Sequence, residues 1–255
     1  MTADWSASQY LKFEDQRTRP ARDLAAQVPL DSPRKVYDLG CGPGNSTETL
    51  MERFPEAEFV GVDSSPDMLD KARKRLPQVK FMQADLARWM PPADADVFYS
   101  NATFQWIPDH IPVLQRLLQA LPEGGALAVQ MPDNVNEPSH RSMREVAAVG
   151  PWADRLKDTP REQLPTVQAY YDALRPHARH VDIWHTHYQH PLHGAEAIAD
   201  WFKGTALRPY LDPLSEAERP EFLVQYKALL SKAYPAQCDG KSLLRFPRLF
   251  MLAVR

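Results

Sequence analysis

The segment that most constrains this chain is Asp38-Leu-Gly-Cys-Gly-Pro-Gly-Asn45, which places three glycines within five residues. It follows an apolar run over residues 35–40 and precedes helical spacing over residues 46–54. Glycines at such a turn let a ligand approach the backbone, and the helix N-terminus offers unpaired N–H groups. A dinucleotide-binding loop has its third glycine one position later, where this chain has Asn45. The segment predicts a ligand-binding turn, although alone it also fits a tight turn that binds nothing.

Short apolar runs alternate with amphipathic segments over residues 34–132. This alternation predicts an α/β fold, a doubly wound and mostly parallel sheet with helices on both faces. The predicted strands there are Lys35–Gly40, Glu58–Asp63, Val79–Asp85, Asp96–Asn101 and Ala126–Met131, with helices over Ser46–Phe54, Pro66–Leu76 and His110–Leu121. Elsewhere we expect strands over Val181–Tyr188 and Leu249–Val254, and helices over residues 8–28, Gly194–Lys203 and Glu216–Tyr234.

Polar residues end three of these predicted strands: Asp63, Asp85 and Asn101. In an open parallel sheet the carboxyl ends of the strands border one crevice. Asp63 also follows Gly40 by about 20 positions, the spacing expected of an acid that binds ribose hydroxyls. Each of these residues alone is more simply a helix cap or a solvated loop residue. Together with the glycine loop they favour a cofactor site.

Composition limits the partners of this chain. A net charge of −3 provides no overall basic field, so nucleic acid is a poor candidate. No uncharged apolar run reaches the roughly 18 residues that a membrane helix needs. Two cysteines, Cys41 and Cys238, cannot build a disulfide framework. We therefore expect a cytoplasmic protein with no membrane partner, in which any anionic ligand meets a local group of cations.

The glycine loop with Asp63, Asp85 and Asn101 resembles the class I S-adenosylmethionine-dependent methyltransferases. Further stretches resemble, within that class, the trans-aconitate 2-methyltransferase family, and the resemblance covers nearly the whole chain. It implies a single methyltransferase domain over residues 1–255, with a seven-stranded sheet whose last strand is antiparallel. The stretches that carry the closer resemblance include Arg17–Pro20, Gln105–His110, Ala128–Asn134, Val181–Trp184 and Phe246–Phe250.

The resemblance implies S-adenosyl-L-methionine as the cofactor and assigns roles around it. The three glycines would line its methionine portion, Asp63 would hold the ribose and Asp85 the adenine amino group. Leu86 and Met68 would flank the adenine, and Asn101 would lie beside the transferred methyl. Arg19 is a candidate for the cofactor carboxylate, although a surface cation is nearly as good an interpretation. The full predicted cofactor set is Arg19, Asp38, Gly40, Gly42, Gly44, Asp63, Ser64, Met68, Asp85, Leu86 and Asn101.

The implied reaction is esterification of one carboxylate of a small polycarboxylate. A carboxylate is ionised at neutral pH, so we expect no catalytic base and no metal, only orientation and charge stabilisation. The resemblance also implies an N-terminal helical lid (1–30), a cofactor-binding half (30–133) and a helical substrate cap (193–241 with part of 134–175). Our candidates for binding the substrate are Trp106, Arg144, Arg208 and Arg248, where a solvated salt bridge is the alternative for each arginine.

Two other features of the sequence bear on alternative functions. His185, His187 and His190 could suggest a metal site, but no cysteine or carboxylate cluster lies near them in the sequence, and they could instead help to hold substrate carboxylates. Nucleobase amino-methyltransferases carry an Asn/Asp-Pro-Pro-aromatic motif where this chain has Asn101-Ala-Thr-Phe104. Two alternatives stay open: a class I methyltransferase for another small carboxylic acid, and a nucleotide-binding protein without catalysis.

Overall fold

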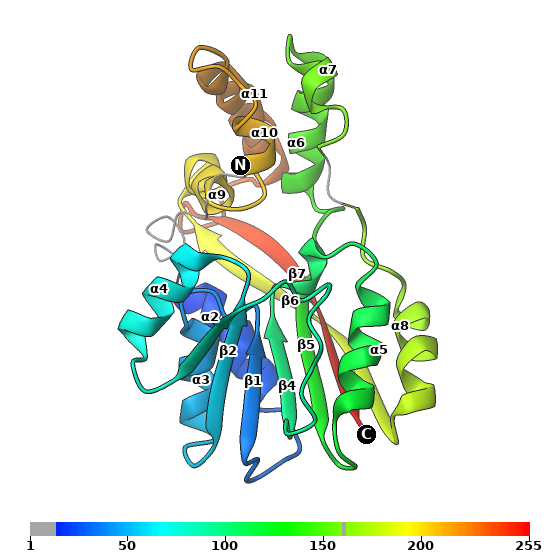
Figure 1. Ribbon diagram of the computed structural model, residues 1–255. Coiled ribbons are helices and arrows are strands. Elements are labelled where there is room, and N and C mark those ends of the chain that lie inside the picture. The colour runs from blue at the N-terminus through cyan, green and yellow to red at the C-terminus, as the bar shows by residue number, and fades with distance from the viewer. Residues whose placement is uncertain (1–13, 160–161) are drawn as a thin grey trace.

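One continuous seven-stranded sheet organises the computed structural model, which describes residues 14–159 and 162–255 (Figure 1). The strands are β1 (Lys35–Leu39), β2 (Glu58–Asp63), β3 (Lys80–Gln83), β4 (Val97–Asn101), β5 (Ala126–Pro132), β6 (His180–Leu192) and β7 (Ser242–Val254). Their order is β3-β2-β1-β4-β5-β7-β6, in which β1 to β5 pair in parallel and β7 lies antiparallel between β5 and β6. The predicted fold, including its antiparallel last strand, is confirmed.

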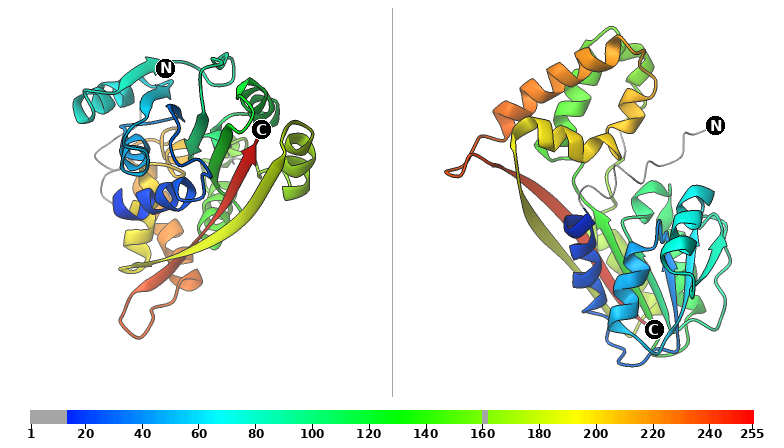
Figure 2. Two further views of the ribbon diagram at one scale, coloured as in Figure 1. Left: turned by 90° about the horizontal axis from the view of Figure 1, so that it is seen from below. Right: turned by 90° about the vertical axis from the view of Figure 1, so that its left-hand side faces the viewer.

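Helices cover both faces of the sheet, as Figure 2 shows. On the first face lie α2 (Glu14–Ala25) and α3 (Asn45–Arg53), and on the second lie α5 (His110–Ala120) and α8 (Val167–Leu174). Successive residues of β1 alternate between them: Val36 packs in the cluster of α2 and α3, and Tyr37 in that of α5 and α8. The remaining elements near the sheet are α4 (Pro66–Arg75), η1 (Phe104–Trp106) and η2 (Arg175–His177).

A second group of helices stands beyond the carboxyl ends of the parallel strands (Figure 1). We call this group the cap, and it consists of α6 (Pro138–Val149), α7 (Ala153–Leu156), α9 (Gly194–Lys203), α10 (Arg208–Leu211) and α11 (Glu218–Ala233). Within it α11 packs against α6 and α9, and the rings of Trp152 and Phe222 lie 5.3 Å apart. The division into lid, cofactor half and substrate cap stays a prediction, and residues 8–13 of the expected first helix lie outside the described residues.

Element boundaries differ most from the sequence prediction at β3, β6 and β7. The strand predicted over Val79–Asp85 was too long, because the chain leaves the sheet after Gln83. The last two strands were predicted too short, since they pair with each other along all of β6 and β7. Pro191 and Pro247 lie outside the predicted strands, yet both are paired within this two-stranded ribbon, which runs from the sheet into the cap (Figure 2). None of the described helices has both the length and the apolar character needed to cross a membrane.

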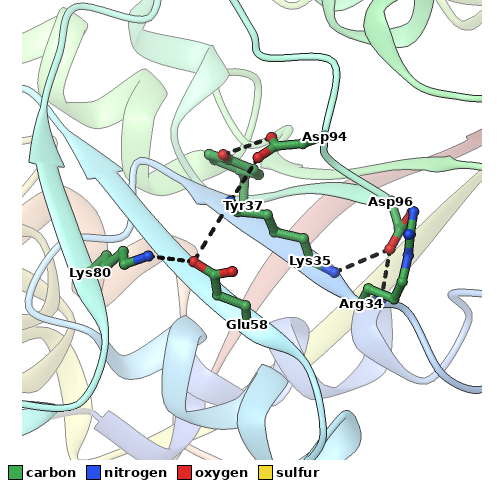
Figure 3. A network of polar contacts seen from close by, with 7 residues as sticks. All are labelled: Arg34, Lys35, Tyr37, Glu58, Lys80, Asp94 and Asp96. Carbon is green, nitrogen blue, oxygen red and sulfur yellow. Dashed lines mark hydrogen bonds and ion pairs between the residues drawn. The ribbon is translucent and has the colours of Figure 1, made fainter.

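A polar network secures the amino ends of the parallel strands, far from the cap (Figure 3). Oδ2 of Asp96, just before β4, accepts hydrogen bonds from the backbone N–H of Arg34 (2.6 Å) and of Lys35 (3.1 Å). Nζ of Lys35 also pairs with Asp94 (2.7 Å) and Glu58 (3.6 Å). The hydrogen bond from Lys35 lowers the pKa of Asp94. This network therefore fixes the register of adjacent strands at their amino ends. The carboxyl ends of the strands stay available for binding.

Replacing Asp96 by Ala should lower the free energy of unfolding by about 1–3 kcal/mol, because two backbone N–H groups lose their acceptor. Arg34→Ala is the matched control. The guanidinium of Arg34 is exposed, so this substitution removes only its 3.4 Å ion pair with Asp96. The backbone N–H of residue 34 still donates to Asp96. Urea unfolding followed by circular dichroism measures both variants. Equal stability of the two would contradict the assigned role of the Asp96 backbone contacts.

Candidate functional site

The glycine loop between β1 and α3 adopts backbone angles that favour glycine. Gly40, Gly42 and Gly44 have φ values of +75°, +53° and +93°. A Cβ on Gly40 would lie 2.0 Å from Oγ1 of Thr103, so a side chain does not fit there. A Cβ on Gly42 would meet nothing within 4 Å, so the backbone there faces open space. The loop therefore presses against the segment after β4 on one side and is open to a ligand on another.

Asp38 holds this loop from behind. Its side chain is buried at the end of β1, and its Oδ2 accepts hydrogen bonds from the hydroxyls of Ser46 (2.7 Å) and Thr47 (2.6 Å) in α3. Burial raises the pKa of Asp38 to about 6, although these two hydrogen bonds oppose the rise. We interpret Asp38, predicted as a cofactor residue, as the group that positions the loop.

Asp63 links the glycine loop to the next helix. Its Oδ2 accepts from the backbone N–H of Gly42 and its Oδ1 from that of Ser65, both at 2.9 Å. Ser65, rather than Ser64, caps α4 and receives the N–H of Met68 at 3.3 Å. A carboxylate oxygen can accept more than one hydrogen bond, so the predicted contact of Asp63 with a ribose stays compatible with this geometry.

The residues predicted around the adenine follow the carboxyl ends of β2 and β3. Asp85 is exposed two residues beyond β3, and its Oδ1 accepts the backbone N–H of Ala87 at 3.0 Å. Leu86 and Met68 are buried, and Ser64 is exposed. Their contacts with an adenine stay predictions.

Arg19, predicted to bind the cofactor carboxylate, lies on α2. Its guanidinium carbon is 5.2 Å from the centre of the Tyr188 ring, and its Nε is 3.8 Å from Asp23. Its side chain is exposed. Binding of the cofactor carboxylate by Arg19 therefore stays a prediction.

A cavity of about 710 Å³ lies between the carboxyl ends of the strands and the cap. Three of the four predicted substrate residues line it: Trp106, Arg144 and Arg248. The lining also includes Asn101, predicted beside the transferred methyl. Arg208 is not part of the lining within the described chain, although the next two residues are, and its guanidinium lies 3.7 Å from Asp212. The structure thus brings one arginine from α6 and one from β7 to the same space.

Arg248 is a buried cation in the wall of this cavity formed by the sheet. Its side chain is only 4% exposed, and its Nη1 donates to Oε1 of Gln130 at 2.9 Å. Its guanidinium carbon lies 4.8 Å from the centre of the Phe246 ring. Because Oε1 of Gln130 can only accept, this hydrogen bond orients the guanidinium in the cavity wall. We call the pair of Gln130 and Arg248 the floor of the cavity.

Arg144 is the corresponding cation of the cap. It is half-buried on α6, and its Nη1 donates to the backbone carbonyl of Val135 at 2.7 Å. Among the described side chains, those of residues 18–159 and 162–255, no carboxylate lies at ion-pair distance from Arg144. A carbonyl partner orients a guanidinium but leaves its charge available to an anion.

The sequence prediction missed several residues of the cavity, among them His110, Asn134, His140 and Tyr210. The spacing of His140 and Arg144, four positions apart, would have signalled His140 had the α6 helix been predicted.

His110 is fixed on both ring nitrogens, since Nδ1 lies 3.0 Å from the Ile107 carbonyl and Nε2 lies 2.6 Å from the Tyr170 hydroxyl. The Ile107 carbonyl can only accept, so Nδ1 carries the proton and the Tyr170 hydroxyl donates to Nε2. Burial lowers the pKa of His110, so it is a neutral positioning group at this wall of the cavity.

The three histidines of β6 have separate partners. His185 Nε2 lies 2.9 Å from Asp133, His187 lies 3.2 Å from Arg245, and His190 stacks on Trp201 at 4.7 Å. Burial lowers the pKa of His190 to about 4, which keeps this imidazole neutral. None of the three belongs to the cavity lining found among the described residues, and a role with substrate carboxylates stays a prediction.

Comparison with known proteins agrees with the geometry. A family model described as a methyltransferase domain matches residues 36–125, which contain the glycine loop and Asp63. Over 255 residues the chain is 59% identical to a trans-aconitate 2-methyltransferase of Rhodopseudomonas palustris strain BisB5, covering 99% of this chain and 100% of the relative. The chain belongs to the trans-aconitate 2-methyltransferase family. A relative of the same description from Agrobacterium fabrum is 54% identical over 253 residues, covering 98% of this chain and 99% of its own.

Solved structures share the fold of this methyltransferase at low identity. The YcgJ protein of Bacillus subtilis aligns with a TM-score of 0.62 at 12% identity, covering 93% of this chain and 98% of its own. An O-methyltransferase from a trans-AT PKS multienzyme of Brevibacillus brevis, in complex with S-adenosyl-L-homocysteine, aligns with a TM-score of 0.54 at 17% identity, covering 96% and 75%. Membership of an enzyme family sets aside the alternative of a nucleotide-binding protein without catalysis.

The buried Asp38 predicts a specific dependence of stability on pH. Its pKa is about 6 in the folded protein and about 3.9 when unfolded, so the folded state holds the proton more tightly. The stability contribution is present below pH 4 and is lost as the pH rises through 6. Relative to Asp38→Asn, the wild type should lose about 2–3 kcal/mol of unfolding free energy between pH 4 and 7. Urea unfolding at several pH values measures the difference, and parallel pH profiles would contradict it.

Proposed function

We propose that this chain transfers the methyl group of S-adenosylmethionine to a carboxylate of trans-aconitate, forming a monomethyl ester. The observation that carries the proposal is the cavity at the carboxyl end of β4, with the buried Arg248 on one side and Arg144 on the other. Two cations placed on separate elements suit a small polyanion better than a fatty or phenolic acid. The names of the relatives support trans-aconitate as that polyanion.

The residues present fit the cofactor. Gly42 leaves open space at the loop, and Oδ1 of Asn101 is buried without a hydrogen-bond partner among the described residues. Gly40, Gly42 and Gly44 would receive the methionine portion, and Asp63 would receive the ribose. When bound, S-adenosylmethionine supplies a methyl group on a sulfonium, which an ionised carboxylate can accept without a base.

The work of the protein is then to place the substrate and balance its charge. Trans-aconitate has three carboxylates, so two remain as anions while one reacts. Arg248 and Arg144 would hold these two, which leaves the third to approach Asn101 and Trp106. Nη1 of each arginine donates to a neutral oxygen of the protein, which orients the guanidinium. Both ring nitrogens of His110 are engaged by Ile107 and Tyr170, and His190 does not line the cavity found among the described residues, so neither is placed to take a proton from the substrate.

Two further predictions belong to this proposal. The net charge of −3 favours a protein without a nucleic-acid partner. A cytoplasmic location also stays a prediction.

The direct experiment is radiolabelled methyl transfer from S-adenosylmethionine to trans-aconitate, cis-aconitate, citrate and itaconate. We expect kcat/KM to be higher for trans-aconitate than for itaconate, because trans-aconitate offers two carboxylates to the arginines while the third reacts. A higher kcat/KM for a monocarboxylic acid added to the panel would overturn the proposed substrate, and the alternative of another small carboxylic acid would then stand.

Arg248, which lines the cavity, and Arg208, which does not, provide a matched pair of variants. Arg248→Met should reduce kcat/KM for trans-aconitate by about 2–4 kcal/mol, the scale for leaving a desolvated charge unpaired. Arg208→Met should have little effect, because Arg208 lies off the cavity lining. Steady-state kinetics measures both, and an unchanged affinity for S-adenosylhomocysteine shows that the variants are folded. A large effect of Arg208→Met together with none of Arg248→Met would show that the substrate lies elsewhere.

A further inference from the structure

Three hydrogen-bond donors converge on the cavity from the cap. His140 and Arg144 lie four residues apart on α6, which places both on one face of that helix. Tyr210 belongs to α10, and all three residues line the cavity. His140 and Tyr210 are buried, with exposed fractions of 8% and 5%. Neither was predicted from the sequence, and neither has a part in the function proposed above.

The chemistry of this group suits an acceptor. Arg144 has donors and no acceptors, and one of them is used by the Val135 carbonyl. Burial raises the pKa of the Tyr210 phenol, so the hydroxyl keeps its proton at neutral pH, and the charge of Arg144 is close enough to act on that pKa in the opposite direction. The Ser139 hydroxyl lies 3.3 Å from Nδ1 of His140.

The carboxylates in the same lining do not neutralise this group. Asp109 and Glu162 are both exposed, and neither forms an ion pair with Arg144 within the described chain. The guanidinium of Arg144 and the phenol hydroxyl of Tyr210 match the oxygens of a carboxylate, and His140 lines the same cavity. The floor offers a second such place at Arg248, on a different element of the fold.

We infer that His140, Arg144 and Tyr210 form a cap subsite for one carboxylate that does not react, separate from the subsite at Arg248. The inference rests on the proposed function and specifies its substrate class: acids with two carboxylates besides the one that is methylated. The substrate then bridges the cap and the floor. A diacid has one spare carboxylate, which the fully buried Arg248 takes, so the cap subsite distinguishes triacids from diacids.

The test compares variants that differ only in whether they touch the cavity. Tyr210→Phe removes the hydroxyl from the subsite, and its control is Tyr226→Phe. Tyr226 is a buried tyrosine of the same cap, off the cavity lining, whose hydroxyl has no hydrogen-bond partner among the described residues. Arg144→Met removes the cation, and its control is Arg141→Met, an exposed arginine of the same helix. Calorimetry measures binding of trans-aconitate and of itaconate to protein saturated with S-adenosylhomocysteine.

We expect Arg144→Met to weaken trans-aconitate binding by roughly 10- to 100-fold and Tyr210→Phe by about 10-fold, as for hydrogen bonds to a charged group. Both controls should stay near the wild-type dissociation constant, and binding of itaconate should change little in any variant. Equal behaviour of the subsite variants and their controls, or an equal loss for both acids, overturns the subsite. If the wild type methylates trans-aconitate, that result leaves the proposed function standing. If the wild type neither binds nor methylates trans-aconitate, both proposals fail.

Discussion

The close approach of Gly40 to Thr103 is the constraint on which the site depends. It joins the turn after β1 to the turn after β4, with no room for a Cβ between them. Thr103 Oγ1 also donates to the Gly40 carbonyl at 3.3 Å. The loop predicted to hold the cofactor and the wall that carries Asn101 and Trp106 are therefore fixed relative to each other. Asp38 and Asp63 secure the same loop from behind and from the side.

The first half of the fold was predictable because each strand is a short apolar run that ends at a glycine or a polar residue. β2 was predicted with its observed bounds, and β1, β4 and β5 to within one residue at either end. The ribbon of β6 and β7 was not, because Pro247 and the polar residues of β6 depend on a pairing that a local pattern does not reveal. The cavity shows the same division: Arg144 and Arg248 came from family resemblance, whereas Tyr210 becomes visible only when α10 packs on the cap.

Cap and sheet contribute opposite halves of one binding space. The sheet provides a buried guanidinium held by Gln130, and α6 provides a half-buried one held by a backbone carbonyl. A site divided in this way recognises a ligand by the distance between its charges as well as by their number. A small substrate can thus be selected with few contacts, because each free carboxylate of the substrate must reach a different arginine.

The β6–β7 ribbon also determines where this protein could be recombined with its relatives. Within a single strand, Phe246 packs with Phe202 in the cap, Arg248 lies in the floor, and Leu249 belongs to the core of the sheet. An exchange of residues 193–241 alone would therefore import new helices onto the old half of the ribbon. A chimera that keeps the contacts of both partners needs junctions near the paired His187 and Pro247, and it must also carry α6 and α7, because α11 packs against α6 and Phe222 lies beside Trp152.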